Sequence, residues 1–246
     1  MEEDFISLSP YDKFRFSCTS NLSCFNECCR DLNQFLTPYD ILRLKNNLGI
    51  SSGLFLKTFT SHHIGPETGL PVITIKTNLA SGSICPFVTP SGCKVYKDRP
   101  SSCRTYPLAR LVSRNRESGR LSEYYTLIKE KHCLGFNNGR EQTVSKWIIE
   151  QDIEPYNRMN DMLMEIISLK NQLVRGELDI KSGYLFRMAL YDIDGFRSYL
   201  FTDKERLDAL NDSYINTLKQ NDTALLVFAL SWVRQNLFSN SSFFNT

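Results

Sequence analysis

The cysteines of this chain are confined to one part of the sequence, and that distribution constrains the fold more than any other feature. All eight lie between residues 18 and 133 of a 246-residue chain, and the later residues contain none. The stretch SCFNECCRDL, residues 23–32, holds three of them, two of which are adjacent. Sulfur at this density is typical of a disulfide framework, a redox-active thiol or a metal centre.

The beginning of the chain bears on which of the three kinds of site to expect. The opening residues, MEEDFISLSPYDKF, are acidic and lack the basic region and apolar run of a secretory signal. The most apolar stretch, ALLVFALSWV at residues 224–233, is too short to cross a membrane. We therefore expect a cytoplasmic protein with no membrane partner, in which structural disulfides are rare. Eight cysteines in such a protein favour metal binding or catalysis over a disulfide framework.

The charge of the chain is nearly balanced. The formal net charge is +2, so no strong field indicates nucleic acid as a partner, and none is expected. Five arginines nevertheless gather within one short stretch, CRTYPLARLVSRNRESGR, which begins at Cys103. We interpret this stretch as a solvated arginine face, with a site for phosphate or an acidic partner as the alternative.

Hydrophobic periodicity predicts a mostly α-helical protein with a small β-hairpin or sheet. Residues 37–49 predict a helix with Thr37 as N-cap and Gly49 as its stop, and a shorter helix follows over residues 53–59. Residues 70–78 alternate as a strand does, and residues 85–96 predict a hairpin. Helical spacing then dominates, with a pattern over 144–176 interrupted near Pro155 and further helices near 180–191, 203–219 and 221–238.

These patterns divide the chain into two regions. Residues 1–136 form an irregular cysteine-cluster region that we expect a metal to organise, because the free energy of metal binding becomes folding free energy. Residues 137–246 form a helical region that packs on it. Chelation, or a Cys-to-Ser change at Cys24, Cys28, Cys85 or Cys103, is therefore expected to unfold the first half.

The spacing of the cysteines predicts which thiols can act together. If CFNECC is helical, Cys24 and Cys28 project from one face about a turn apart, and Cys29 points about 100° away. Cys29 then either serves a second site or packs as a small apolar residue. The hairpin turn brings Cys85 and Cys93 to the same end, and Cys103 lies between two prolines that restrict its loop.

Thiolates are soft ligands that select zinc, copper(I) or iron–sulfur clusters. The spacing C-x5-C-x3-C-C, followed by C-x7-C and two more distant cysteines, is neither that of a zinc finger nor that of a bacterial ferredoxin. Spacing alone therefore does not identify the metal. Two adjacent histidines, His62 and His63, are interpreted as part of a surface loop, with metal ligation or acid–base chemistry as the alternative. The phosphate-binding and hydrolase motifs that could indicate other chemistry are absent from the sequence.

Four segments of the chain resemble a known family. They are C-x-x-x-C-C at 24–29, LTPYDILRL at 36–44, CPFV and GCKVY within 85–96, and RPSSCRTYP at 99–107. In this order they are similar to the cysteine-cluster family of zinc- or iron-chelating proteins with a CxxCxxxCC signature. The resemblance covers roughly residues 15–135. Five residues separate Cys18 from Cys24, where the family signature has two.

The same cysteine pattern resembles that of flagellin lysine N-methylases, which are associated with an iron–sulfur cluster and S-adenosylmethionine. The resemblance implies that the metal or cluster ligands are Cys18, Cys24, Cys28, Cys29, Cys85, Cys93 and Cys103, with Cys133 as a further member. It also implies a protein partner or a protein substrate. The cysteine-free C-terminal half contains no motif that matches a methylase.

Three hypotheses follow, and they leave open whether the protein is an enzyme. The leading one is a metal-binding protein whose thiolates hold an iron–sulfur cluster of the 4Fe–4S type in a structural, redox or accessory role, with zinc as the alternative metal. Eight cysteines would complete two four-thiolate centres, or one centre with supporting cysteines. The second hypothesis is an S-adenosylmethionine-dependent protein-lysine N-methyltransferase, and the third is a redox or interaction module with free thiols.

Overall fold

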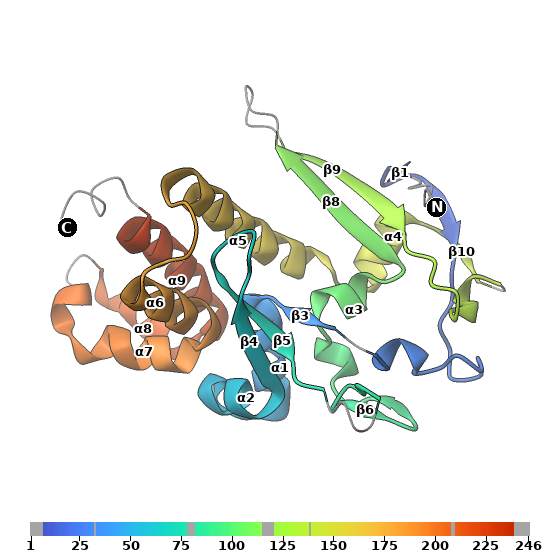
Figure 1. Cartoon of the computed structure of the whole chain (residues 1–246), viewed down its shortest axis with the longest axis horizontal. Coiled ribbons are helices and arrows are strands. Elements are labelled where there is room, and N and C mark those ends of the chain that lie inside the picture. The colour runs from blue at the N-terminus through green and yellow to red at the C-terminus, as the bar shows by residue number, and fades with distance from the viewer. Residues whose placement is uncertain are drawn as a thin grey trace. The chain divides into compact units, whose positions relative to one another are not determined.

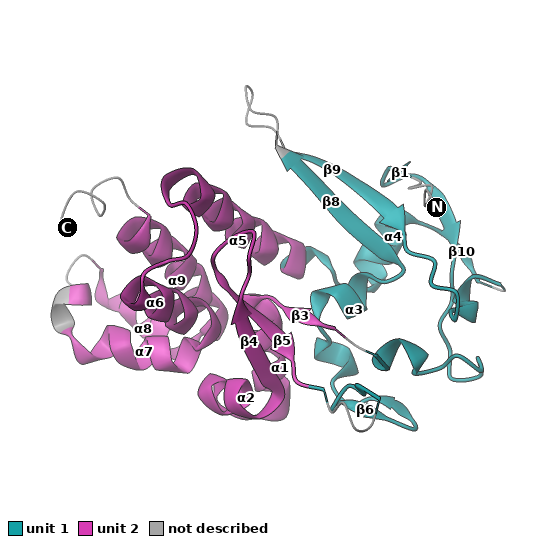
Figure 2. Cartoon of the chain, in the orientation of Figure 1, with its two compact units in different colours: residues 1–32, 77–155 teal, residues 33–76, 156–246 magenta. Residues whose placement is uncertain are grey.

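A computed structural model describes residues 7–31, 33–77, 82–114, 121–137, 139–207 and 210–238 (Figure 1). Within these residues the chain forms two compact units, each built from two separate segments (Figure 2). Unit 1 comprises residues 1–32 and 77–155, and unit 2 comprises residues 33–76 and 156–246. The described residues confirm a mostly α-helical fold with several small sheets and a helical C-terminal half. No described helix is long and apolar enough to cross a membrane.

Unit 1 is built from short strands and turns. In a three-stranded antiparallel sheet, β9 (Leu121–Leu127) is the middle strand between β1 (Ser7–Leu8) and β8 (Leu108–Arg114). Two ladders are smaller, one between β2 (Lys13–Arg15) and β10 (Glu141–Thr143), the other between β6 (Val88–Thr89) and β7 (Gly92–Cys93). The helical elements are single turns or short helices: η1 (Glu27–Cys29), η3 (Tyr96–Asp98), α3 (Ser101–Thr105), η4 (Leu134–Phe136) and α4 (Val144–Glu150).

Phe16 is the centre of the aromatic core of unit 1. Its ring contacts Tyr106, Phe136 and Trp147 edge-on, at centroid distances of 5.7, 5.1 and 5.7 Å. The loop that follows β9 comes so close to Phe16 that a Cβ at Gly135 would lie 2.5 Å from the ring. The chain on both sides of Phe16 is thereby held against the residues that follow Cys133.

Unit 2 combines a small sheet with most of the helices. In the sheet, β5 (Pro71–Ile75) is the middle strand between β3 (Phe35–Leu36) and β4 (Thr60–Ile64), and all pairs are antiparallel. The helices are α1 (Pro38–Leu48), α2 (Ser52–Phe59), α5 (Glu154–Leu173), α6 (Ile180–Tyr191), α7 (Ile193–Thr202), η5 (Lys204–Leu207), α8 (Asp212–Gln220) and α9 (Asp222–Leu237).

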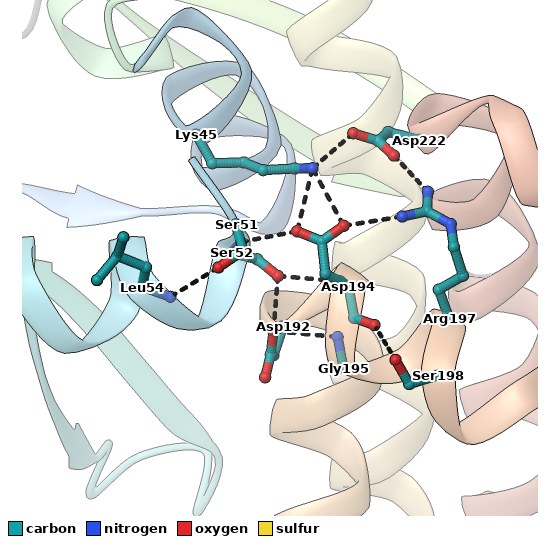
Figure 3. A network of polar contacts seen from close by, with 10 residues as sticks. All are labelled: Lys45, Ser51, Ser52, Leu54, Asp192, Asp194, Gly195, Arg197, Ser198 and Asp222. Carbon is teal, nitrogen blue, oxygen red and sulfur yellow. Dashed lines mark hydrogen bonds and ion pairs between the residues drawn. The ribbon is translucent and has the colours of Figure 1, made fainter. Parts of the chain in front are cut away.

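A network of charged side chains joins three helices of unit 2 (Figure 3). Lys45 of α1 lies 3.2 Å from Asp194 of α7 and 2.7 Å from Asp222 of α9. Arg197 pairs with the same two carboxylates, so two cations and two anions alternate around a closed ring. Ser52 extends the network to α2, because its backbone N–H donates to Asp194 at 2.8 Å.

The first two predicted helices, the hairpin and the interruption near Pro155 are all present in the structure. The helix that begins after Thr37 is confirmed, because Thr37 and Asp40 form a reciprocal capping box and Gly49 ends the helix with a φ of 65°. The second helix and the 85–96 hairpin are confirmed, with the hairpin reduced to two-residue strands. The interruption near Pro155 is also confirmed, since α4 ends at Glu150 and α5 starts at Glu154.

Between residues 192 and 220 the helices differ from the predicted pattern. The helix predicted over 203–219 is confirmed only in its second part: a 3-10 turn ends at Leu207, and α8 begins at Asp212, where Asn211 accepts the N–H of Tyr214. The sequence also did not predict α7, which Asp192 starts by accepting the N–H of Gly195. The compact units group residues 33–76 with residues 156–246.

Candidate metal centre

All eight cysteines lie in unit 1, although they come from four separate segments of the chain. None of them is in a disulfide, and all lie in parts of the chain that the structure describes. Cys85 is buried, while Cys24, Cys29, Cys93 and Cys133 are half-buried and Cys18, Cys28 and Cys103 are exposed. Seven of the eight thiols are thus at least partly accessible from solvent, and the surrounding residues can fix their orientation.

The segment around Cys24 and Cys28 is a series of tight turns and not the continuous helix that was considered from the sequence. Backbone N–H groups bond three residues back, as from Glu27 to Cys24 at 3.0 Å, and only residues 27–29 form a helical turn. Asn26 has a φ of 70°, which an α-helix cannot accommodate. Its side chain instead donates to the carbonyl of Thr89 at 2.9 Å and so ties the segment to the hairpin turn.

The hairpin holds Cys85 and Cys93 beside the vicinal pair. The N–H of Cys85 donates to the carbonyl of Cys29 at 2.9 Å, which fixes the residues before the hairpin against η1. The sulfur of Cys85 receives backbone N–H groups from Phe87 and Val88, and that of Cys93 receives one from Val95. Burial raises the pKa of both thiols, and these N–H groups act in the opposite direction by stabilising the thiolates.

Cys18, Cys24 and Cys133 form a second neighbourhood. The N–H of Leu134 donates to the sulfur of Cys24 at 3.3 Å, so the residue after Cys133 is in direct contact with that thiol. The N–H of Ser17 donates to the carbonyl of Gly135 at 2.9 Å, which places Cys18 beside the same turn. Cys18 accordingly interacts electrostatically with Cys24, Cys28 and Cys133, and partial desolvation together with these neighbours raises its pKa.

Cys28 and Cys29 are in direct contact through their side chains. The hydrogen bond from Cys29 lowers the pKa of Cys28 to about 7, and the same bond, which keeps the proton on Cys29, raises the pKa of Cys29. The expectation that the two sulfurs diverge assumed a continuous helix; in the single 3-10 turn present here the two thiols are hydrogen-bonded to each other. Cys29 also interacts with Cys85 and Cys103, and Cys28 with Cys18, so the vicinal pair lies between the two neighbourhoods.

Cys103 approaches the vicinal pair from α3, the short helix that Pro100 precedes. Tyr106 follows α3, and its hydroxyl is buried. Burial and the nearby thiol of Cys133 raise the pKa of Tyr106. The tyrosine was not predicted as a site residue, although the motif RPSSCRTYP that contains it was noted for its cysteine and prolines.

The sulfurs are gathered but are not arranged around one point. Among the described residues, no three or more His, Cys, Asp and Glu side chains could hold a single metal ion as they stand. The donor set nevertheless suits a soft metal, because the nearest ligating atoms are thiol sulfurs and several already receive backbone N–H groups.

The histidines and arginines singled out in the sequence have other roles. His62 and His63 lie on β4 of unit 2 and are exposed, so the loop interpretation is wrong although they are on the surface. Arg104 is buried, and Arg110 pairs with Glu123 at 2.6 Å, so these two are not part of a solvated arginine face. Of the remaining arginines, Arg116 and Arg120 lie outside the described residues.

A unit of short strands in which thiols converge from four segments is typical of a protein domain that chelates a soft metal. Residues 17–137 match the profile of a family described as "CxxCxxCC: Putative zinc- or iron-chelating domain". The chain belongs to this family through that segment, which covers about half of its length and contains all eight cysteines. No curated protein and no solved structure matches the chain.

Proposed function

We propose that the thiolates of unit 1 hold an iron–sulfur cluster of the 4Fe–4S type, in a structural, redox or accessory role. The observation that carries the proposal is the convergence of cysteines from four chain segments, with backbone N–H groups directed at the sulfurs of Cys24, Cys85 and Cys93. Hydrogen bonds from N–H groups to ligating sulfurs stabilise the thiolate form and tune the potential of iron–sulfur clusters.

A cluster and a single zinc ion need different distances between the ligating sulfurs. In a tetrahedral zinc site with bonds of about 2.3 Å the ligating sulfurs lie about 3.8 Å apart. A cluster carries one ligand on each iron, so its ligating sulfurs lie further apart than those around a single ion. Zinc remains the second candidate, because thiolates bind it strongly.

The two neighbourhoods also suggest how the ligands would be divided. Cys18, Cys24 and Cys133 lie together, Cys85 lies near Cys93, and Cys103 interacts with Cys29. Cys28 interacts with both Cys18 and the hairpin cysteines. Eight thiolates would complete two centres, and in such a division each member of the vicinal pair would serve a different centre.

The test is anaerobic purification followed by measurement of iron, acid-labile sulfide and zinc per chain, with an absorption spectrum. We expect iron and sulfide in equal amounts and a broad absorption band in the blue. The variants Cys85→Ser and Cys24→Ser each lose metal, and Ser23→Ala, an exposed neighbour of Cys24, is the matched control that keeps it. Zinc without sulfide would favour the second candidate. Folded, metal-free protein with all thiols titratable would contradict both.

The proposal places the protein in the cytoplasm, where thiols remain reduced and available to a metal. Neither the family match nor the geometry of unit 1 favours methyl transfer, so we do not propose that activity. Cell fractionation with an antibody against the chain tests the compartment, and recovery of the protein outside the cytoplasmic fraction would contradict it.

A further inference from the structure

Arg99 is a buried positive charge in the middle of the cysteine-rich part of unit 1. Arg99 is only 8% exposed to solvent. The guanidinium donates to the carbonyl of Tyr96 at 2.7 Å and to the side-chain carbonyl of Gln151, and it lies 4.0 Å from the centroid of the Tyr96 ring. These partners are neutral, and within the described residues no carboxylate pairs with Arg99. A buried charge with only neutral partners is costly, so an anion is needed to balance it.

The ionisable groups that interact with Arg99 are the phenol of Tyr96, three thiols and one further arginine. Arg99 interacts electrostatically with Cys93 and Cys103, and Cys18 in turn interacts with Arg99. These three cysteines come from three different segments of the chain, so Arg99 lies where the segments converge. Arg104 is also near and adds a second buried positive charge.

Gln151 fixes the orientation of both arginines. Its side-chain carbonyl accepts from Arg99, and its backbone carbonyl accepts from Nη1 of Arg104 at 2.6 Å. Arg104 also donates to the carbonyl of Lys97. Because rigid backbone and amide acceptors hold them, the two guanidinium groups cannot swing out to solvent as exposed arginines do. The positive charge is therefore built into the framework that positions Cys93 and Cys103.

The geometry points to Arg99 as the residue that balances the negative charge of the metal-bound thiolates. Four thiolates around Zn²⁺, or around a 4Fe–4S core, leave the centre with a net negative charge. Arg99 supplies the opposite charge from inside the protein, where solvent does not screen it. It is a positioning and charge-balancing residue and does not itself ligate the metal. This inference rests on the proposed function, because it requires a thiolate-bound metal in unit 1.

The test compares Arg99→Lys, Arg99→Gln and Arg99→Met in the reconstituted full chain. Loss of the charge in the Gln and Met variants is expected to weaken metal binding at least tenfold and to raise the pH at which half of the metal is released. For an iron–sulfur cluster the midpoint potential is expected to become more negative by about 60 mV, the equivalent of a tenfold change for one electron. Arg99→Lys, which retains the charge, is expected to restore most of both quantities.

The matched control is Arg15→Gln, which removes the same charge from an exposed side chain of unit 1 and is expected to leave both quantities unchanged. If Arg99→Met does not fold, the Lys and Gln variants still compare a charged side chain with an uncharged one, and both side chains are polar. Equal loss of affinity in the Lys and Gln variants would indicate a structural role and overturn the inference. A wild-type chain that binds no metal would instead refute the proposed function.

Discussion

The hydrogen bond between Cys28 and Cys29 gives two neighbouring thiols different chemical properties. In a helix or a strand, side chains that are adjacent in the sequence point away from each other. In the single 3-10 turn of residues 27–29 the thiols of Cys28 and Cys29 are nevertheless bonded to each other. Cys28 becomes the thiol that ionises first, and Cys29 the one that retains its proton.

The pKa of Cys28 gives a prediction for the metal-free, reduced protein. Alkylation of Cys28 by iodoacetamide is expected to increase with pH through a midpoint of about 7, because the thiolate is the nucleophile. In Cys29→Ala the hydrogen bond is lost, and the midpoint is expected to move up towards the ordinary value of 9.0. Mass spectrometry of the alkylated peptides measures both midpoints. An unchanged midpoint in the variant would show that Cys29 does not stabilise the thiolate.

At the scale of elements, the ring of charges in unit 2 fastens three helices to one another. Lys45 is 7% exposed at its side chain and pairs with two half-buried carboxylates, so removing it leaves both without one of their partners. Ser52 and Asp194 are bonded reciprocally at the beginnings of α2 and α7, because the N–H of Ser52 donates to the Asp194 carboxylate at 2.8 Å and the N–H of Asp194 donates to the Ser52 hydroxyl at 2.9 Å. Residues 38–59 are thereby attached to helices that lie about 150 positions later in the chain.

The variant Lys45→Met tests this attachment. We expect it to lower the free energy of unfolding by about 3 kcal/mol, since breaking a buried pair leaves a charge uncompensated. Urea denaturation measures the change, and Lys57→Met, an exposed lysine of α2, is the matched control with an effect within about 0.5 kcal/mol. Similar losses in the two variants would mean that the network contributes nothing specific.

The same network predicts how stability depends on pH. Partial burial acts to raise the pKa values of Asp194 and Asp222, but hydrogen bonds and the charges of Lys45 and Arg197 outweigh it and lower both below 3.8. A folded-state pKa below the unfolded value stabilises the protein above that unfolded value, and the contribution is lost as the pH falls through the folded pKa. The free energy of unfolding is therefore expected to decrease as the pH drops below about 4.

The variant Asp194→Asn is expected to show a shallower acid dependence, because one of the shifted carboxylates is gone. Urea denaturation at a series of pH values compares the two proteins. Parallel curves for the variant and the wild type would show that this carboxylate does not contribute to the acid response.

At the scale of the whole molecule, the two compact units are interleaved along the chain. The polypeptide leaves unit 1 after residue 32, forms part of unit 2 and returns at residue 77 (Figure 2). The cysteines before and after this excursion belong to the same unit, although about fifty residues separate Cys29 from Cys85 in the sequence. A metal that joins them would close a long loop of chain and stabilise unit 1 by restricting its unfolded state.

Metal removal is therefore expected to loosen unit 1 and to spare unit 2. Hydrogen exchange of the chelated protein should increase in residues 7–31 and 82–137, while residues 33–76 remain protected. This outcome distinguishes the interleaved units from a division into two halves, in which residues 33–76 would lose protection together with the cysteines. Uniform exchange across the chain would contradict both divisions.

Local chemistry made much of this fold predictable. The capping box at Thr37, the stop at Gly49 and the turn at Gly92 act within a few residues, so their helix and hairpin follow from the sequence. The contacts that escaped prediction join residues far apart, as in the pairing of β2 with β10 and the hydrogen bond from Arg99 to Gln151. No local periodicity indicates that an arginine will be buried, because the cost depends on partners supplied by the fold.

The sequence by itself determined the kind of site, because only cysteine supplies so many soft ligands and all eight lie in one part of the chain. It also determined the helical character of the C-terminal half, since hydrophobic periodicity is a local property. The tertiary structure alone decided which thiols lie together, that Cys28 and Cys29 share a proton, and that a buried arginine accompanies them. These outcomes depend on turns and long-range packing, whose energies come from contacts between segments that the sequence keeps apart.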